Sequence, residues 1–159
     1  MITTQYTYLA GHYWNSERDP RGGVSTTSYY ADGRISSLTS SVGDVTGFAY
    51  DQALRRTTVT NPDGGTEVTD LDANGDVVRR VDGLGRVMTM AYDANRNLVS
   101  ETNGLGLTKQ YTYDANGFRT SVRDPLGNTS TAVFNAYGGP TSLANALGQP
   151  QTEIGRAHV

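Results

Sequence analysis

The segment of residues 113–133 decides the fold, and its sequence is YDANGFRTSVRDPLGNTSTAV. It contains two turn sequences, DANG and DPLG. Asn tolerates and Gly prefers a positive φ, as a tight hairpin requires, and Pro presets φ at about −65°. Between the turns, Phe118, Thr120 and Val122 alternate with polar residues. This period of two is typical of a strand with one buried face. The segment therefore predicts two antiparallel strands joined by tight turns.

The same segment is one copy of a 21-residue repeat. Steps of 21 residues from Tyr8 place one large apolar side chain at each position, and glycine recurs 14 residues after each of them. The apolar positions are Tyr8, Tyr29, Tyr50, Leu71, Tyr92, Tyr113 and Phe134, and the glycines are Gly22, Gly43, Gly64, Gly85, Gly106, Gly127 and Gly148. A fixed period of this length indicates a repeat array, in which hairpins gain stability by stacking on their neighbours.

We therefore predict an all-β fold, an antiparallel β-hairpin repeat array of about seven units over residues 1–154. The array should contain 12 to 14 strands, two per unit, with hairpin turns at residues 72–75, 93–96 and 114–117. Because such a fragment would bury little core, we also expect it to present open sheet edges.

Composition argues against several classes of protein. The net charge is −3, and the 13 basic residues are scattered along the chain without a basic stripe, so we expect no nucleic-acid partner. No apolar run approaches the roughly 18 residues of a membrane span. Cysteine is absent, which excludes disulfides, thiolate metal sites and a thiol nucleophile.

The repeat register also gives expectations for both ends of the chain. The sequence QYTY of residues 5–8 copies residues 110–113, as expected if the N-terminus lies inside a preceding unit. The next large apolar residue is due at position 155, where the chain has Gly155. Residues 153–159 can be back-translated to a sequence that resembles a common sequencing adapter. We therefore expect residues 153–159 to be a non-native tail.

A Tyr-Asp pair followed by a glycine-bearing turn recurs through the array. It stands at Tyr50-Asp51, Tyr92-Asp93 and Tyr113-Asp114. At the same register, Leu71-Asp72 replaces the first residue of the pair and Phe134-Asn135 replaces both. In this feature the chain resembles the YD-repeat or Rhs (rearrangement hot spot) family, over residues 8–152. The resemblance implies a segment of a spiralling β-sheet that closes as a hollow shell. It also implies a secreted or cell-surface bacterial parent whose shell encloses and helps deliver a C-terminal polymorphic toxin.

The resemblance implies further that the partners are the remaining repeats and the enclosed toxin, and that the chain is not an enzyme. In that family an Asp-Pro-x-Gly-Leu segment closes the shell and cleaves off the toxin. Here Asp124-Pro125-Leu126-Gly127 is followed by Asn128 and lies in the repeat register. We therefore predict an ordinary turn at this position.

Few residues suggest a metal-binding or catalytic site. Asp72, Asn74 and Asp76 offer oxygen ligands at alternate positions, as a calcium loop does, but no Glu follows at the twelfth position. The corresponding residues of sister units include Asn97 and Phe118, which favours a turn. General-base chemistry needs an orienting partner and a nucleophile in reach, and neither is predictable for His12 or His158. We predict no catalytic residue, no cofactor and no metal.

Two sets of residues leave a binding role open. His12-Tyr13-Trp14 is an aromatic cluster outside the register, which suits either an altered first turn or stacking on a sugar. Arg55-Arg56 and Arg79-Arg80 suit either a solvated strand face or contact with an acidic ligand. The alternative function is an extracellular carbohydrate- or wall-binding repeat module, with carbohydrate contact. A single Trp in the chain argues against it, because such modules repeat aromatic cages in every unit.

Overall fold

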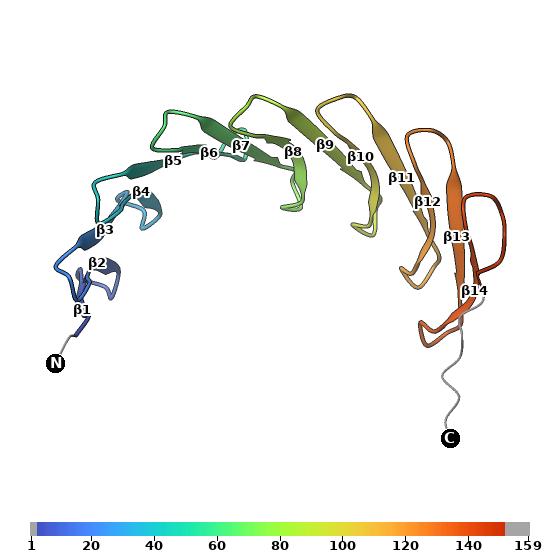
Figure 1. The fold of residues 1–159 in the computed structure, drawn as a ribbon, viewed down its shortest axis with the longest axis horizontal. Coiled ribbons are helices and arrows are strands. Elements are labelled where there is room, and N and C mark those ends of the chain that lie inside the picture. Colours follow the sequence, from blue (N-terminus) through green and yellow to red (C-terminus); the bar gives the residue numbers. More distant parts are fainter. Residues whose placement is uncertain (1–2, 152–159) are drawn as a thin grey trace, which may run out of the picture. The chain divides into compact units, whose positions relative to one another are not determined.

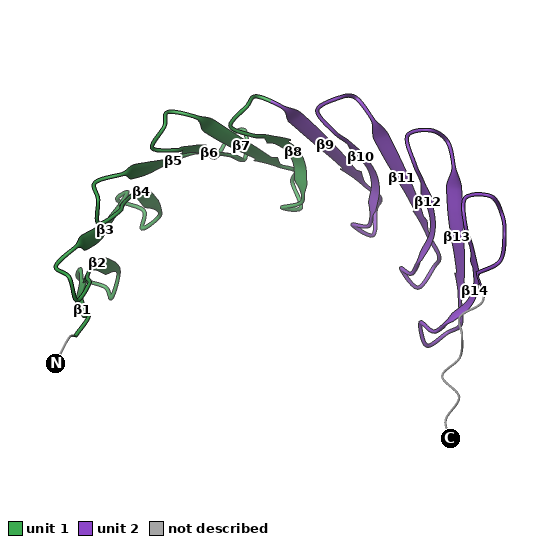
Figure 2. Cartoon of the chain, in the orientation of Figure 1, with its two compact units in different colours: residues 1–85 green, residues 86–159 purple. Residues whose placement is uncertain are grey.

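The computed structural model describes residues 3–151, and this part of the chain is all-β, with fourteen strands in chain order (Figure 1). The predicted fold class and strand number are confirmed. The chain divides into two compact units, Met1–Gly85 and Arg86–Val159 (Figure 2). Each unit is a meander in which successive strands pair antiparallel, so each is a run of consecutive β-hairpins.

The first unit contains eight strands. They are β1 (Gln5–Tyr8), β2 (Trp14–Arg18), β3 (Val24–Tyr29), β4 (Ile35–Thr39), β5 (Val45–Asp51), β6 (Arg56–Thr60), β7 (Thr66–Leu71) and β8 (Val77–Val81). Thr, Val, Tyr and Ile are frequent in these strands, and such β-branched and aromatic residues suit a pleated, half-exposed surface.

The second unit contains six strands that repeat the same pattern. They are β9 (Val87–Tyr92), β10 (Leu98–Thr102), β11 (Thr108–Tyr113), β12 (Arg119–Arg123), β13 (Thr129–Phe134) and β14 (Pro140–Ala144). After β14 the chain turns once more, and Pro150 forms an isolated antiparallel bridge with Ala144.

One turn geometry joins most of these strands, and the turn at residues 72–76 illustrates it. The Gly75 N–H donates to the Asp72 carbonyl oxygen (3.3 Å), and the Asp72 N–H donates to the Asp76 carbonyl oxygen (2.9 Å). The Asp72 Oδ1 atom also accepts hydrogen bonds from the N–H groups of Asn74 and Asp76. The same pair of side-chain bonds is made by Asp19, Ser40, Asp93, Asn103, Asp114, Asp124, Asn135 and Asn145. The turns predicted at residues 72–75, 93–96 and 114–117 are confirmed.

The fourth residue of each such turn has a positive φ, which explains the glycine register. All seven of the periodic glycines have positive φ, with values such as 77° at Gly85 and 92° at Gly127. Asp124 to Gly127 therefore forms an ordinary turn, as predicted. Arg96 takes the same conformation (φ 67°) where its sister units have Gly75 and Gly117.

The large apolar residue of each repeat lies at or next to the end of an odd-numbered strand, and beside an irregularity in the pairing in every repeat except that of Tyr50, whose strand pairs without a shift. Register shifts occur next to the pairs Tyr29↔Ile35, Leu71↔Val77, Tyr92↔Leu98, Tyr113↔Arg119 and Phe134↔Pro140. A β-bulge of this kind leaves part of the hydrogen-bond ladder unpaired. The repeat therefore places its aromatic side chain where the backbone needs an additional partner.

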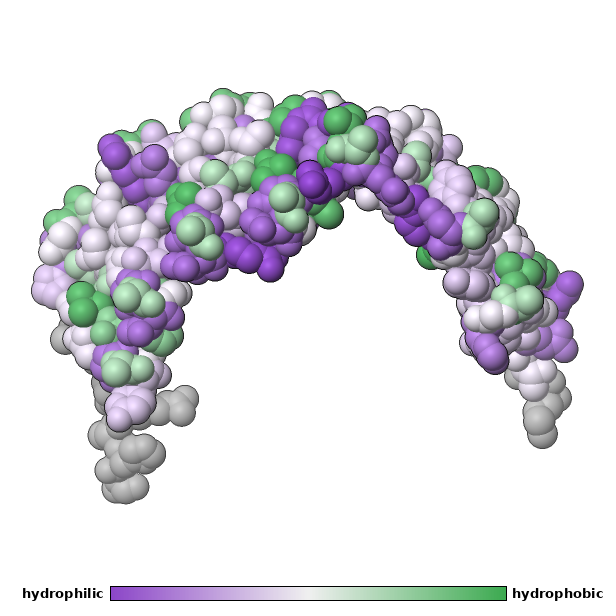
Figure 3. Space-filling model, turned by 180° about the vertical axis from the view of Figure 1, so that it is seen from behind, coloured by the Kyte–Doolittle hydropathy of each residue, from purple (hydrophilic) through white to green (hydrophobic). Residues whose placement is uncertain are grey.

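Neither unit has a hydrophobic core among the described residues. No hydrophobic side chain in residues 3–151 is buried, and the one buried side chain is Thr27, which is 2% exposed. Figure 3 shows hydrophobic and hydrophilic residues interspersed over the face it presents. The expectation of a buried face on the strand after Phe118 is therefore wrong, since Val122 is only half-buried. The physical reason is that each unit is one sheet with no second layer packed on it, whereas the expected shortage of core is confirmed.

We expect Gly85→Ala to lower the free energy of unfolding by about 1 kcal/mol, because an L-residue with a Cβ is strained at positive φ. The matched control is Gly83→Ala in the same turn, where φ lies outside that region. A Cβ at either glycine would meet no atom within 4 Å, so the two variants differ only in backbone strain. Urea denaturation followed by circular dichroism measures both. Equal stability of the two variants would contradict the turn geometry.

Candidate interaction surface

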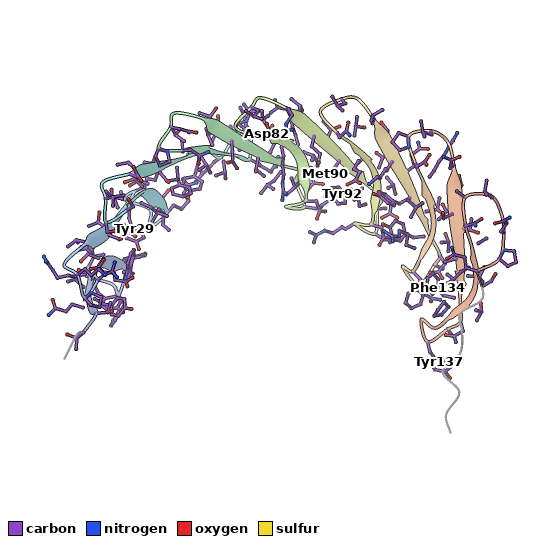
Figure 4. The ribbon with its side chains drawn as sticks, in the orientation of Figure 1. Tyr29, Asp82, Met90, Tyr92, Phe134 and Tyr137 are labelled. Carbon is purple, nitrogen blue, oxygen red and sulfur yellow. The ribbon has the colours of Figure 1, made fainter. Side chains whose placement is uncertain are left out.

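The two faces of the sheet differ in chemistry, and the second unit shows this most clearly. Cross-strand partners share a face, so the pairings Met90↔Glu101, Glu101↔Lys109 and Tyr111↔Val122 define one side. We call this side the aromatic face, and in the second unit it carries Met90, Tyr92, Tyr111, Tyr113, Val122 and Phe134. Figure 4 labels Met90 and Tyr92 of β9 and Phe134 of β13.

The opposite side carries hydroxyl groups. The Oγ1 atoms of Thr102 and Thr108 lie 2.8 Å apart, and Thr112 Oγ1 lies 2.7 Å from Ser121 Oγ. These threonine and serine pairs connect neighbouring strands directly, as cross-strand pairs do in stable sheets. The hydroxyl side therefore satisfies many of its own polar groups, whereas the aromatic face leaves apolar surface half-exposed.

Tyrosine hydroxyl groups on the aromatic face link one hairpin to the preceding one. The Tyr113 hydroxyl donates to the Leu98 carbonyl oxygen (2.9 Å), and the Tyr29 hydroxyl donates to the Trp14 carbonyl oxygen (2.6 Å). In both cases the acceptor is the first residue of the preceding strand and lies 15 residues earlier. The accepting carbonyl lies beside a register shift between its own strand and the preceding one, so the hydroxyl contacts the sheet where that pairing is irregular. Tyr29 and Tyr113 fill this role at the periodic position.

A cluster of aromatic rings lies in the first unit. The ring centroids of Tyr13 and Tyr29 are 5.1 Å apart, and Tyr30 meets Tyr50 edge-on at 6.1 Å. The Arg34 guanidinium lies over the Tyr50 ring at 4.5 Å, within cation–π distance. Arg34 is held there by Asp32, whose Oδ2 atom is 2.6 Å from Arg34 Nη2. Beside these residues is a hollow of about 450 Å³.

The predicted cluster His12-Tyr13-Trp14 is divided among different roles. His12 has a positive φ (68°) in the first turn, where the Leu9 N–H donates to the Tyr13 carbonyl oxygen. Tyr13 packs on Tyr29, and Trp14 is the first residue of β2. The structure thus brings Tyr13 into the aromatic cluster while His12 occupies the turn.

A shallow hollow of about 570 Å³ lies on the aromatic face of the second unit. Phe118 and Phe134 form one side of it, with ring centroids 5.4 Å apart, and Val122, Leu143 and Tyr113 also line it. Polar residues such as Arg119, Thr131 and Asn145 line it as well, so the hollow is a shallow surface of mixed polarity that suits contact with another surface.

A charged cluster spans three adjacent strands of the first unit, on the hydroxyl side. Arg56 of β6 makes two hydrogen bonds to Asp70 of β7, at 2.6 and 2.8 Å, and Arg79 of β8 reaches Asp70 Oδ2 at 3.1 Å. Hydrogen bonds from Arg56 and then Arg79 hold the pKa of Asp70 below its usual value, although burial opposes the shift. Of the predicted basic pairs, Arg56 and Arg79 thus share one carboxylate. Arg55 lies in the preceding turn, and Arg80 pairs with Thr69 on the aromatic face.

A second polar cluster lies on the aromatic face of the second unit. The Tyr111 hydroxyl donates to Glu101 Oε1 (2.6 Å), and Lys109 Nζ lies 3.6 Å from the same oxygen. Burial raises the pKa of Tyr111 to about 12, and the hydrogen bond to Glu101 adds to the shift. Tyr111 therefore stays protonated and acts as a hydrogen-bond donor, not as a base.

The remaining sequence candidates are placed as follows. Asp72 directs its Oδ1 atom at two backbone N–H groups of its own turn, so this oxygen serves as a turn acceptor. Within residues 3–151, no group of three or more His, Cys, Asp or Glu side chains is arranged to hold a metal ion. His158 and the predicted tail at residues 153–159 lie outside the described residues. No helix in the described part of the chain is long and apolar enough to cross a membrane.

These features define a structural repeat protein built from consecutive β-hairpins. The family model of the RHS repeat matches residues 29–66, 72–108 and 92–129, so the chain belongs to the RHS repeat family. The resemblance seen in the sequence is thereby confirmed. No curated protein sequence matches the chain.

Several solved structures have the same fold. A crystal structure of TcdB2-TccC3-TEV is similar with a TM-score of 0.60 and 15% identity, over 92% of this chain and 11% of that one. TcdB2-TccC3 without its hypervariable C-terminal region gives a TM-score of 0.59 at 14% identity, with the same coverage. TcdB2-TccC3 gives 0.58 at 14% identity, over 92% of this chain and 12% of that one. The chain thus spans about a ninth of the length of these relatives.

We expect Tyr113→Phe to lower the free energy of unfolding by about 1 kcal/mol, because the Leu98 carbonyl loses its hydroxyl donor. The control is Tyr137→Phe, since the Tyr137 side chain is 97% exposed at a turn. That variant should match the wild type. Urea denaturation of the chain and both variants tests this, and an unchanged stability of Tyr113→Phe would contradict the role of the hydroxyl.

We expect Asp70→Asn to cost about 1 kcal/mol at pH 7, a modest value because both arginine side chains are partly exposed. Since the folded-state pKa of Asp70 lies below the unfolded value of about 3.9, this contribution is complete above about pH 5 and is lost as the pH falls through the folded-state pKa. The stability gap between wild type and variant should therefore close in acid.

Urea titrations at several pH values measure this gap. The control Asp44→Asn removes a charge from an exposed turn residue. A gap for Asp70→Asn that stays constant from neutral pH into acid would contradict the assignment.

Proposed function

We propose that this chain is a wall segment of an Rhs-type shell that encloses a C-terminal polymorphic toxin and helps to deliver it. The wall segment comprises residues 1–154 as about seven hairpin repeats, and it acts by structure and not by catalysis. Its partners are the other repeats of the parent protein and the enclosed toxin. The parent is exported and acts outside the cell or at its surface.

The observation that carries this proposal is the absence of a hydrophobic core in a sheet with well-formed turns. Every strand of residues 3–151 pairs with a neighbour in a hairpin, yet no hydrophobic side chain there is buried. A sheet of this kind becomes stable by extension and by contact with further surfaces. A wall made of many such hairpins both extends the sheet and brings it into contact with other surfaces.

The family and the fold support the same proposal. The RHS repeat model matches more than half of the chain, and the similar structures are of TcdB2-TccC3 complexes. One of these is a form without the hypervariable C-terminal region of that protein. A constant repeat region followed by a variable C-terminal region is the arrangement expected of a container with exchangeable contents.

A carbohydrate-binding module is the alternative, and it draws less support from the geometry. Such a module needs aromatic rings free to stack on sugars in each repeat. Here the Arg34 guanidinium lies over the Tyr50 ring, and Tyr29 and Tyr113 use their hydroxyl groups within the sheet. A glycan-array screen of the chain distinguishes the two, because binding that saturates on defined glycans would favour the module.

Limited proteolysis of the parent protein tests the enclosure directly. The gene that contains this sequence is expressed in full, and the rate at which a protease digests the C-terminal region is compared with that of the same region expressed alone. We expect the region to be protected within the parent and digested when free. Equal digestion rates, with the repeats still folded by circular dichroism, would overturn the proposal.

A further inference from the structure

Exposed leucines recur at one position of the repeat. Leu84, Leu105, Leu126 and Leu147 are separated by 21 residues each, and their side chains are between 80% and 86% exposed. Each is the third residue of the turn that follows an even-numbered strand. A single exposed leucine needs no explanation, but a row of them at one register marks a surface.

Strand direction places the three leucines of the second unit in one row of hairpin turns, along one margin of the sheet. In the second unit, the turns after β10, β12 and β14 all lie at the same end of the strands, because successive strands alternate in direction (Figure 1). We call Leu105, Leu126 and Leu147 the leucine edge. The turns at the other end carry Asn95, Asn116 and Tyr137 at the same position.

The turn itself does not require leucine. The Leu126 N–H donates to Asp124 Oδ1 at 2.9 Å, and the Asn116 N–H donates to Asp114 Oδ1 at the same distance. Both residues fulfil the same role through the backbone, so their side chains are free to differ. Folding of the turn therefore does not explain why one edge is apolar and the other polar.

The two central residues of each turn at the leucine edge are apolar in the second unit, whereas the first residue is Asn103, Asp124 or Asn145. The residues that precede the leucines are Gly104, Pro125 and Ala146, which carry no charge and are exposed. Neighbouring leucines are two strands apart, which corresponds to roughly 10 Å at a strand spacing of 4.7–4.9 Å. The edge is thus a regular row of apolar side chains with gaps between them.

We propose that the leucine edge packs against the leucine edge of a second copy of this chain, with the two rows running in opposite directions. Identical rows have the same spacing, so the leucines of one copy fit the gaps of the other. The opposite edge is a poorer partner, because contact with leucine would bury the amides of Asn95 and Asn116 without hydrogen bonds. An antiparallel contact between equal edges is self-complementary and closes as a dimer.

The size of the edge determines the strength of this contact. Three leucines from each copy bury less than the roughly 1,200 Å² of a stable interface. The dimer is therefore weak, with a dissociation constant on the order of 0.1–1 mM. Each further repeat adds one leucine, so the contact strengthens with the number of repeats. This inference stands independently of the enclosed toxin.

Sedimentation equilibrium of the whole chain between about 20 µM and about 1 mM tests the proposal. The triple variant Leu105→Asn, Leu126→Asn, Leu147→Asn places at this edge the residue found in the sister turns, so its fold should persist by circular dichroism. We expect the wild type to dimerise and the triple variant to lose at least about tenfold in affinity. The control, Tyr137→Asn, removes a large exposed side chain from the other edge and should dimerise like the wild type.

Cross-linking gives a second measurement that does not depend on the triple variant folding. The chain has no cysteine, so Leu126→Cys and Asn116→Cys each introduce one thiol. Leu126→Cys should form a disulfide dimer faster than Asn116→Cys. A monomeric wild type at the highest concentration, unchanged association of the triple variant, or preferential cross-linking between the two cysteine variants when mixed would overturn the proposal.

Discussion

A hydrogen bond from the backbone to an Asp, Asn or Ser side chain at most of the turns is the interaction on which the rest of the structure depends. In nine turns of the described chain, the first residue accepts two such bonds, as Asp114 does from Asn116 and Phe118. A residue with positive φ, which is glycine in all of these turns except that of Arg96, then returns the chain to the next strand. Because these bonds lie within five residues, they fix the length of these hairpins without help from a core. The strands can therefore vary in sequence while the repeat persists.

The absence of a core transfers the stabilising role to contacts within the sheet. The hydroxyl groups of Tyr113 and Tyr29 donate to carbonyl oxygens beside the bulges, and hydroxyl pairs such as Thr102 and Thr108 connect neighbouring strands. The Arg56–Asp70–Arg79 cluster does the same with charge. Each of these interactions joins adjacent strands, so stability grows with each added hairpin and does not depend on a distant partner. This is the energetic pattern of a repeat protein.

Such a sheet presents four distinct surfaces: an aromatic face, a hydroxyl face, a leucine edge and a polar edge. The half-exposed aromatic rings of Phe118 and Phe134 and the exposed leucines are the parts that gain most from contact with other surfaces. The proposed role as a wall segment accounts for this property, because a wall segment is covered by other surfaces in its parent protein.

The sequence by itself determined the elements of this protein. Asp-Ala-Asn-Gly and Asp-Pro-Leu-Gly encode their turns through bonds within five residues, so the positions of the turns, the number of strands and the family could be predicted. The sequence places leucine at a fixed position of the repeat, but it does not show that these side chains are exposed. Arg96 shows the limit of the glycine rule, since it takes a positive φ without being glycine.

Only the tertiary structure decided how residues from different strands meet. Pairing and bulges set the register, and this brings Arg56 and Arg79 to either side of Asp70 and places the Tyr113 hydroxyl at Leu98. No local pattern encodes these contacts, because they depend on which atoms of two strands face each other. The tertiary structure also decided that the aromatic face is half-exposed. Alternation in a strand indicates which face suits burial, but it does not supply a second layer to cover that face.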